Sequence, residues 1–538
     1  MRRRGGRSRP DGRIWIGLSW LSLALILAMM GVLAALICGN SFQALWPNRV
    51  ERVRLADGGV FLGVPVNRDV SPEGLPRLQY KVGNRELNAG ADFRWVYEEN
   101  IVSRDYPRDA VVMDRIENGV FLGFVGDDAA KSEEDLQTRL DAYRERRNAE
   151  EEPLRRKLAA LGEDWRGIHL AALKANYEME RSTASADKAQ WERRLQAERE
   201  REFAVKAESE KLMGELSRVK EMLTLETVTL ATADGQALVL PLASVVDVSR
   251  PNAMTMPERL ARFCVNAWHL LTRYPREANT EGGIYPALFG TVMLVFLMAV
   301  SAFPLGVAAG VYLREYAKDG IVSRTARVAV NNLAGVPSIV YGIFGLGFFV
   351  YGMGGTIDAL LYPERVAAGI GTYGGGGIIW SALTLGLLTL PVVIVATEEA
   401  LATVPSEIRQ GSLALGATRF QTLWRVILPM ASPGILTGFI LAMARAAGEV
   451  APLMLTGAVK SAHSLPLDGS WPFVHLERKF MHLGFHIYDM VFQSPNVEAS
   501  KPLVYLTALV LLVLVFSLNF AAIRLRGRMR DKYAMKGF

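Results

Sequence analysis

Long apolar segments dominate the C-terminal half of this 538-residue chain and constrain its fold more than any other feature. About 20 helical residues cross the hydrocarbon core of a bilayer, so a run of roughly 18 or more nearly uncharged residues predicts a membrane span. Six segments meet this condition: 14–38, 287–313, 328–352, 376–397, 429–452 and 502–523. The sequence therefore predicts an α-helical membrane protein with six spans.

The first apolar segment follows a basic start, as the core of a secretory signal peptide would. Its apolar run from Ile14 to Cys38 is longer than a typical signal core, and no clear small-residue cleavage site follows it. We therefore expect a retained membrane anchor over residues 14–38.

Basic residues flank the predicted spans at both ends of the chain. Residues 1–13 carry six arginines against the single Asp11, and residues 524–538 carry four arginines and two lysines. Short flanks rich in Lys and Arg stay in the cytoplasm. Six spans place both termini on one side, so we expect both in the cytoplasm; the positive charge gives little reason to propose nucleic-acid binding. The predicted inside loops are 314–327 and 398–428, and the predicted outside segments are 40–285, 353–375 and 453–501.

The longest outside segment begins with a β-rich domain, which we place at residues 40–256. Short apolar runs alternate with glycine-containing turns such as Asp57-Gly58-Gly59 and Asp234-Gly235, a pattern typical of β-hairpins. Gly-Val-Phe-Leu-Gly occurs at 59–63 and again at 119–123, which favours a repeated strand unit. Chance recurrence of five common residues is the alternative.

Residues 131–222 interrupt the β-rich pattern with a helical one. Apolar side chains recur at spacings of three and four among charged residues, as at Leu136, Leu140 and Tyr143. This period predicts an antiparallel helical hairpin or short coiled coil with its tip near 181–185. A single solvated helix without a partner is the alternative. The outside domain is therefore predicted as α+β with an inserted hairpin.

Residues 257–286 form a predicted amphipathic linker from this domain to the membrane. We expect His269 within it to lie at the interface or in the core rather than to bind a metal. The two cysteines of the chain, Cys38 and Cys264, are far apart in sequence. We expect two buried thiols, with a disulfide in an oxidising compartment as the alternative.

The predicted inside loop 398–428 carries charges that would be costly in lipid, beginning with Glu398 and Glu399. Gly416 permits a tight turn between two short helices, and Ala417 permits close packing after it. These features predict a charged loop with two short helices. An ordinary linker between two spans is the alternative.

Arg445 and Glu449 form a charged pair within the fifth apolar segment. Their separation of four residues places both on one face of a helix. Ionisable groups at such depth are costly unless they are paired or wet, so we expect the pair to face a cavity or a partner. A guanidinium offers a bidentate fork to an oxyanion that loses its water. A neutralised structural pair between helices is the alternative.

Several phrases occur in the order found in PstA-type phosphate permeases, the membrane subunits of ATP-binding-cassette importers. They are the Gly-Gly-Ile-Tyr-Pro run at 282–291, Pro304–Val307, Leu333–Gly342, the loop from Val404 to Thr418, and Ala444–Pro452. The resemblance covers roughly 282–525 and leaves residues 40–250 outside. One departure is Gln410-Gly411-Ser412, where the family loop often begins with Glu-Ala-Ala.

The resemblance implies a fold, a location and a set of partners. It implies a six-span type I importer permease bundle, with the core at 287–525, in a bacterial inner membrane and with residues 40–285 periplasmic. It implies a homologous second permease, two copies of an ABC ATPase and a periplasmic phosphate-binding protein as partners.

The resemblance also assigns roles to residues of this chain. Arg445 and Glu449 would lie on the phosphate pathway, with Arg445 as a transient docking point. Glu398, Glu399, Arg409, Gly416 and Ala417 would belong to the loop that couples to the ATPase.

The sequence contains no Gly-x-x-x-x-Gly-Lys-Ser/Thr phosphate loop. ATP must therefore be bound by a separate subunit, and we expect a transport subunit that is not itself an enzyme and has no cofactor. Two other functions stay open: the same machinery for another oxyanion or small solute, and a membrane-anchored envelope scaffold or sensor.

Three histidines and one carboxylate lie in the last outside loop: His475, His482, His486 and Asp489. His482 and His486 are separated by four residues, which is also a metal-ligand spacing. We expect a structural or docking role rather than a metal site.

Overall fold

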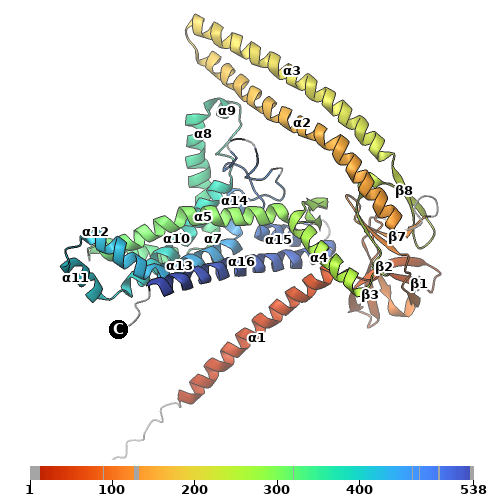
Figure 1. The fold of residues 1–538 in the computed structure, drawn as a ribbon, viewed down its shortest axis with the longest axis horizontal. Helices are drawn as coiled ribbons and strands as arrows, with labels where there is room; N and C mark the ends of the chain where they lie inside the picture. The colour runs from red at the N-terminus through yellow and green to blue at the C-terminus, as the bar shows by residue number, and fades with distance from the viewer. Residues whose placement is uncertain are drawn as a thin grey trace, which may run out of the picture.

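The computed structural model describes residues 12–88, 90–126, 133–318, 320–462, 464–469, 471, 473–494 and 497–533. A bundle of long helices forms one part of the molecule, and a β-rich outer domain lies beyond one end of it (Figure 1). A long helical hairpin rises from the outer domain (Figure 1).

Six helices among the described residues are long and apolar enough to cross a membrane. They are Trp15–Leu45, Tyr285–Tyr316, Ser338–Leu361, Ile378–Ala402, Arg419–Gly448 and Val497–Asp531. The predicted fold class is confirmed: a six-span helical protein with an α+β outer domain.

Four helices form the centre of the bundle: α5 (Tyr285–Val311), α10 (Ile378–Ala402), α13 (Leu428–Gly448) and α16 (Val497–Tyr533). Helix α10 is the most buried of the six spans. A Cβ atom at Gly438 of α13 would lie 2.3 Å from the Cβ of Ala396 in α10. Small residues therefore allow the two helices to approach closely.

Helix α1 (Gly12–Leu45) lies apart from these helices over most of its length (Figure 1). It meets the bundle near its end, where Ala44 and Leu45 pack against a core that includes Leu503 and Leu506 of α16. Most of its other large apolar side chains are exposed, as expected for a helix surrounded by lipid.

The predicted third span, 328–352, is wrong in its bounds. Helix α6 (Ile321–Leu333) ends before a break, and a new helix runs through α7 (Ser338–Phe344), the π-helical segment η5 (Gly345–Gly354) and α8 (Gly355–Leu361). Gly335 and Pro337 explain the break, because proline lacks an N–H donor and disfavours helix in the residue before it.

Shorter elements form the ends of some spans or lie between spans. They are η4 (Tyr312–Tyr316), α9 (Pro363–Ala367), α11 (Ser406–Ala414), α12 (Arg419–Thr422), η6 (Leu423–Ile427), α14 (Ala451–Thr456) and α15 (Leu483–Phe492).

The outer domain contains two five-stranded antiparallel sheets, with strand orders β4-β3-β2-β1-β5 and β10-β6-β7-β8-β9. The first sheet contains β1 (Glu51–Leu55), β2 (Val60–Val70), β3 (Pro76–Lys81), β4 (Phe93–Tyr97) and β5 (Ile101–Asp105). The second contains β6 (Val111–Arg115), β7 (Val120–Val125), β8 (Thr227–Ala231), β9 (Ala237–Pro241) and β10 (Val245–Ser249). Short 3-10 turns η1 (Glu98–Asn100) and η2 (Leu242–Ser244) precede β5 and β10.

The repeated Gly-Val-Phe-Leu-Gly phrase has the same structural place in both sheets. It opens the second strand of the β1–β2 hairpin and of the β6–β7 hairpin. Gly63 pairs with Glu51 at the start of β1, and Gly123 pairs with Val111 at the start of β6. The prediction of a repeated strand unit is therefore confirmed, since chance recurrence would not produce equal registers.

Helices α2 (Glu133–Arg181) and α3 (Ser185–Thr224) form the predicted antiparallel hairpin between β7 and β8. The alternative of a single unpartnered helix is wrong. At the base, Leu136 and Leu140 of α2 are fully buried with Phe121 of β7. The hairpin therefore shares its core with the second sheet.

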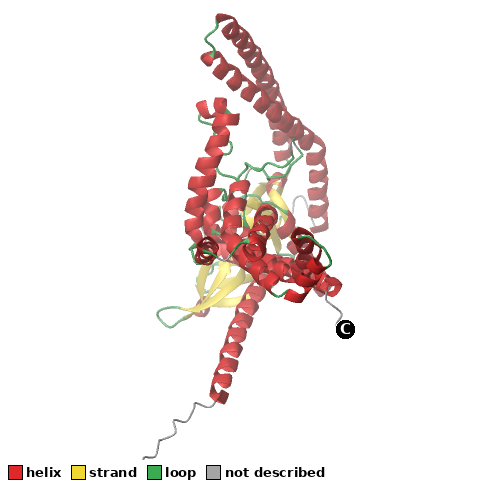
Figure 2. Ribbon diagram, turned by 90° about the vertical axis from the view of Figure 1, so that its left-hand side faces the viewer, coloured by secondary structure: helices red, strands yellow, loops and turns green. Residues whose placement is uncertain are grey.

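The hairpin arches back toward the bundle. Helix α2 contacts α9, which follows the outer end of the third span. Figures 1 and 2 both place α9 beside the distal part of α2. The outer domain is thus attached to the bundle at a second point, far from the linker that joins the two in sequence.

The linker contains α4 (Met256–Thr272) and a small turn with β11 (Pro275–Arg276), η3 (Glu277–Asn279) and β12 (Glu281–Gly282). The expectation of buried thiols is wrong, because Cys38 and Cys264 are both exposed and free. Cys264 lies on the outward face of α4, where the amphipathic pattern directs its side chain away from the outer domain.

Candidate functional site

The 398–428 loop lies at the end of the bundle opposite the outer domain, near the end of α16 (Figure 1). Glu398 and Glu399 lie in the last turns of α10 rather than in the loop itself. Helices α11 and α12 follow, and Gly416 separates them with a φ of +87°. Few residues other than glycine adopt this conformation, so the predicted turn between two short helices is present.

Side-chain hydrogen bonds fix the start of α12. The Thr418 hydroxyl accepts from the Gln421 N–H at 3.2 Å, and the Gln421 side chain accepts from the Thr418 N–H at 2.9 Å. This capping box restarts the helix directly after Gly416 and the partly buried Ala417. Two helices at a defined angle therefore project from this end of the bundle.

Arg409 ties α11 to the rest of the bundle. Its guanidinium lies 3.0 Å from the Glu315 carboxylate in η4, and it donates to the Leu401 carbonyl at 2.6 Å. One side chain thus joins the loop to the ends of α5 and α10.

Glu398 forms a second tie at this end. Its carboxylate accepts from Arg327 of α6 at 3.2 Å, and Arg327 also donates to the Leu313 carbonyl at 2.8 Å. Helices α6 and α10 are therefore linked beside η4. Glu399 is exposed and takes no part in this contact.

Exposed apolar side chains, which the sequence analysis does not single out, cover the outer surface of the loop. Leu415 is 91% exposed, and Phe420 and Trp424 stack with ring centroids 6.3 Å apart while remaining exposed. Large exposed apolar groups beside charged ones are typical of protein interaction sites. The separation of Phe420 and Trp424 by four residues in a charged loop could have revealed them.

Arg445 and Glu449 form the predicted ion pair, with Nε and Oε1 3.3 Å apart. The expectation that both lie on one helix face is wrong, because α13 ends at Gly448 and Glu449 has an extended backbone. Gly448 and Pro452 explain the end: glycine weakens the helix, and proline cannot donate to the carbonyl four residues earlier. Both side chains are partly exposed, so an ion outside the protein core can reach the arginine.

A continuous helix joins the charged pair to the loop. Helix α12, η6 and α13 form one uninterrupted element from Arg419 to Gly448. At a rise of 1.5 Å per residue, Arg445 lies roughly 40 Å along this helix from Arg419. One continuous helix, which contains the π-helical segment η6 and the internal Pro433, therefore connects α12 to Arg445.

A cavity of about 280 Å³ lies next to α14, the helix that follows Glu449. Its lining includes Val350 of η5, the glycines at 374–376, residues 454–459 and Lys479. The lining thus combines glycines and apolar side chains with one cationic side chain, Lys479.

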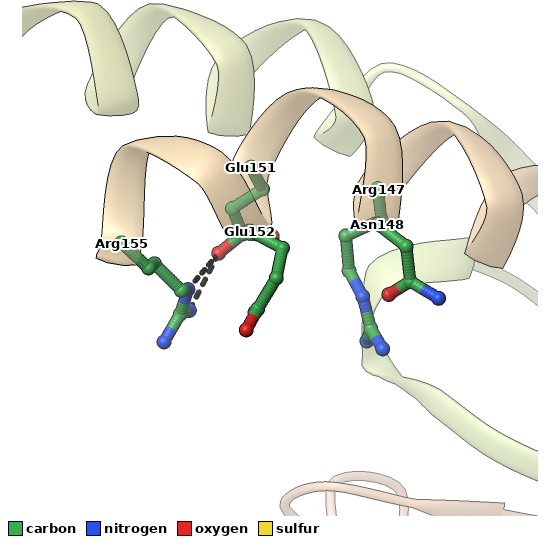
Figure 3. A pocket seen from close by; sticks show the side chains of 5 residues that line it. All are labelled: Arg147, Asn148, Glu151, Glu152 and Arg155. Atoms are coloured by element: carbon green, nitrogen blue, oxygen red, sulfur yellow. Dashed lines mark hydrogen bonds and ion pairs between the residues drawn. The ribbon is translucent and has the colours of Figure 1, made fainter. Parts of the chain in front are cut away.

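A second hollow, of about 260 Å³, lies on α2 (Figure 3). Arg147, Asn148, Glu151, Glu152 and Arg155 line it, and Arg155 pairs with Glu151 (Figure 3). All five belong to one helix, and their charges oppose one another. This arrangement does not favour a particular ligand.

In the last outer loop, His475 and His482 contact other groups of the same loop. His482 caps α15 by accepting from the Gly484 N–H at 3.1 Å, and burial lowers the pKa values of His482 and His486 to about 4. Asp489 instead accepts from Asn279 of the linker at 3.0 Å. His475 contacts Asp468 at 3.1 Å. Over the described residues, no group of three or more His, Cys, Asp or Glu side chains could hold a metal ion.

Comparison with known proteins places the bundle in a family. Residues 302–531 match the family model described as binding-protein-dependent transport system inner membrane component. Phosphate transport system permease protein PstA 1 of Mycobacterium tuberculosis (strain CDC 1551 / Oshkosh) is 36% identical over 245 residues, which cover 46% of this chain and 71% of the relative. This chain belongs to the PstA permease family.

Two further relatives come from other organisms. The permease is 36% identical to the probable phosphate transport system permease protein PstA of Methanocaldococcus jannaschii over 249 residues, covering 46% of this chain and 76% of the relative. It is 34% identical to the probable ABC transporter permease protein YqgI of Bacillus subtilis over 240 residues, covering 43% and 75%. Among solved structures, the inward-facing MetNI methionine ABC transporter matches 51% of this chain and 99% of that chain, at 19% identity and a TM-score of 0.34.

The family match includes the 398–428 loop and the Arg445–Glu449 pair, and it leaves the outer domain outside. The match begins at residue 302, after the whole outer domain and the linker. The permease therefore carries an additional N-terminal domain that contacts the bundle through the linker and through α9.

Proposed function

We propose that this chain forms half of the transmembrane pathway of an ATP-driven importer for inorganic phosphate. The observation that carries the proposal is the 36% identity over 245 residues to a relative named as a phosphate transport system permease. The helix that bears Arg445 and the loop that bears Gly416 both lie within the family match at 302–531.

Arg445 is proposed as a transient phosphate contact on the pathway. A guanidinium forms charge-assisted bidentate hydrogen bonds with phosphate oxygens. Glu449 at 3.3 Å orients the guanidinium and limits its affinity for the anion, which allows release. No covalent step is involved, so the arginine acts by binding alone.

The 398–428 loop is proposed as the contact with an ABC ATPase. Its two short helices, the exposed Leu415, and the stacked Phe420 and Trp424 offer an apolar surface bordered by charge. Movement of the ATPase would be transmitted by the continuous helix from Arg419 to Gly448. The pathway would then switch access by rearrangement of packed helices.

The proposed assembly contains a homologous second permease, two ATPase copies and an external phosphate-binding protein. We place the chain in the bacterial inner membrane with both termini in the cytoplasm and residues 40–285 in the periplasm. The basic flanks at 1–13 and 524–538 support this orientation. The end of α16 at Tyr533 and the 398–428 loop lie at the same end of the bundle, opposite the outer domain (Figure 1).

Uptake of radiolabelled phosphate tests the proposal. Cells that lack their own high-affinity phosphate importer would express the chain with its neighbouring importer subunits, with and without excess unlabelled sulfate. We expect the cells to take up labelled phosphate, and we expect excess sulfate not to reduce this uptake. Absence of phosphate uptake, while the chain still copurifies with the ATPase, would contradict the substrate. Absence of both would contradict the importer itself.

A further inference from the structure

Helix α4 has its polar face turned inward and its apolar face turned outward. Its exposed, outward residues are Met256, Pro257, Glu258, Leu260, Ala261, Cys264, Val265 and Trp268, of which only Glu258, in the first turn, is charged. Leu260 is 58% exposed and Trp268 is 66% exposed. A helix on the surface of a domain in water shows the opposite pattern, so the outward face of α4 is not directed at water.

Two arginines of the inward polar face bind the outer domain. Arg262 forms an ion pair with Asp247 of β10 at 2.8 Å. The buried Arg259 donates to the Pro251 carbonyl at 2.7 Å. These contacts fix the rotation of α4, so its apolar face cannot turn inward without leaving buried charges unpaired.

Contacts with α1 place α4 at the level where the first span ends. Asn266 donates to the Leu45 carbonyl at 2.9 Å. The ring of Phe263 lies 5.1 Å from that of Phe42. At the other end, the Leu270 carbonyl accepts from the Ile284 N–H at 2.8 Å, directly before α5 begins. Helix α4 therefore bridges the outer ends of two membrane spans.

The outward face of α4 continues the lipid-facing surface of α1. Leu36 and Phe42 of α1 are 56% and 50% exposed, and they precede the point where α4 is attached. Trp268 and Tyr274 are also exposed near this level, and such aromatic side chains concentrate at membrane interfaces. Helix α4 crosses the end of α1 rather than extending it (Figure 1).

We propose that α4 is an interfacial helix whose apolar face inserts into the lipid of the outer leaflet. The partner is the boundary between lipid headgroups and acyl chains, the usual environment of an amphipathic helix lying in the membrane plane. The helix anchors the outer domain at a fixed height and rotation above the bundle, through Arg262, Asn266 and the turn that follows. This role is independent of the transported solute.

The two native cysteines allow a direct test in the full-length protein reconstituted in phospholipid vesicles. The variant Cys38→Ser leaves Cys264 as the single nitroxide attachment site on the apolar face. The variant Cys264→Ser leaves Cys38 on α1 as the lipid reference. A third variant, Cys38→Ser/Cys264→Ser/Phe203→Cys, labels the exposed surface of α3 as the water reference. Collisions with oxygen, which partitions into lipid, and with a water-soluble nickel chelate are measured by electron paramagnetic resonance.

We expect the Cys264 label to favour oxygen over nickel by several fold, as at Cys38 and opposite to position 203. Nickel access equal to that at position 203 would overturn the proposal by showing water at this face. Low access to both reagents would also overturn it, because a protein partner would then cover α4. A label at Leu260→Cys in the background lacking both native cysteines repeats the measurement if labelling Cys264 disturbs the helix. Since no step requires transport, failure of the proposed function would leave the result unaffected.

Discussion

Arg409 of α11 and Glu315 of η4 lie 3.0 Å apart and join the 398–428 loop to the end of the first core span. The two residues are separated by a full pair of spans in the sequence. Arg409 also donates to the Leu401 carbonyl. The loop is therefore held by two spans in addition to the helix that follows it, which is the arrangement expected of a part that transmits force.

We expect Arg409→Ala to uncouple the ATPase from transport. Loss of the ion pair and of the hydrogen bond to Leu401 frees α11, so ATP hydrolysis should continue while phosphate uptake falls about tenfold, equivalent to about 1.4 kcal/mol. Hydrolysis and uptake are measured in parallel in reconstituted vesicles. The exposed Arg324 of α6 provides a matched control, and Arg324→Ala should leave both unchanged. Equal uptake in the two variants would contradict the role of Arg409.

Gly416→Ala should weaken the loop, whereas Gly411→Ala should not. A Cβ atom added at either position would meet no other atom within 4 Å, but only Gly416 has a left-handed φ of +87°. An L-residue in this region costs about 1 kcal/mol or more, while alanine within α11 is favourable. Copurification of the ATPase with each variant measures the effect. Similar losses from both substitutions would show that space rather than backbone conformation matters.

Replacement of the charged pair by apolar residues distinguishes a pathway from a structural role. Arg445→Leu/Glu449→Leu removes both charges together, so the folded protein should persist. Loss of a charged hydrogen-bonding group costs about 1.5–3 kcal/mol, and phosphate uptake should fall by at least about tenfold. Arg445→Lys should retain part of the uptake with a raised KM, because lysine lacks the bidentate fork. Full uptake by the double variant would support the structural alternative.

The joint between linker and bundle should depend on Asn279 in two ways. Its side chain donates to the buried Asp489, and its φ of +73° is left-handed. Asn279→Gly removes only the side-chain hydrogen bonds, to Asp489 and to the Lys460 carbonyl, whereas Asn279→Ala also strains the backbone. We expect a loss of about 1–3 kcal/mol for the first and a larger loss for the second. Thermal unfolding in detergent measures both, and equal stability of the two variants would show that backbone strain is absent.

Stability should decline in mild acid through the buried histidines. The folded pKa values of His482 and His486 are lowered to about 4 from an ordinary 6.5. Below pH 6.5 the unfolded chain binds protons that the folded chain excludes, so stability present above pH 6.5 is lost as the pH falls toward 4. The variant His482→Asn/His486→Gln, which keeps a capping side chain at position 482, should flatten this decline. Unfolding temperatures between pH 7.5 and 5 measure it.

Much of the fold follows from local patterns in the sequence. Apolar runs long enough to cross a bilayer predict the six spans, and a spacing of three and four residues predicts the hairpin of α2 and α3. Gly416 predicts a turn because glycine is suited to a left-handed backbone. The partners of the site residues are harder to predict from the sequence. The charge of Arg409 can be read there, but Glu315 and Leu401 become its partners only through packing.

The sequence by itself determined the number of spans, the hairpin, the turn at Gly416 and the family of the bundle, because each depends on residues close together in the chain. Only the tertiary structure decided that Arg409 pairs with Glu315, that α2 reaches α9, and that the apolar face of α4 points outward. These features depend on surfaces far apart in sequence, whose meeting is set by the packing of whole helices and sheets. No local pattern encodes that packing, so it emerges only when the elements are assembled.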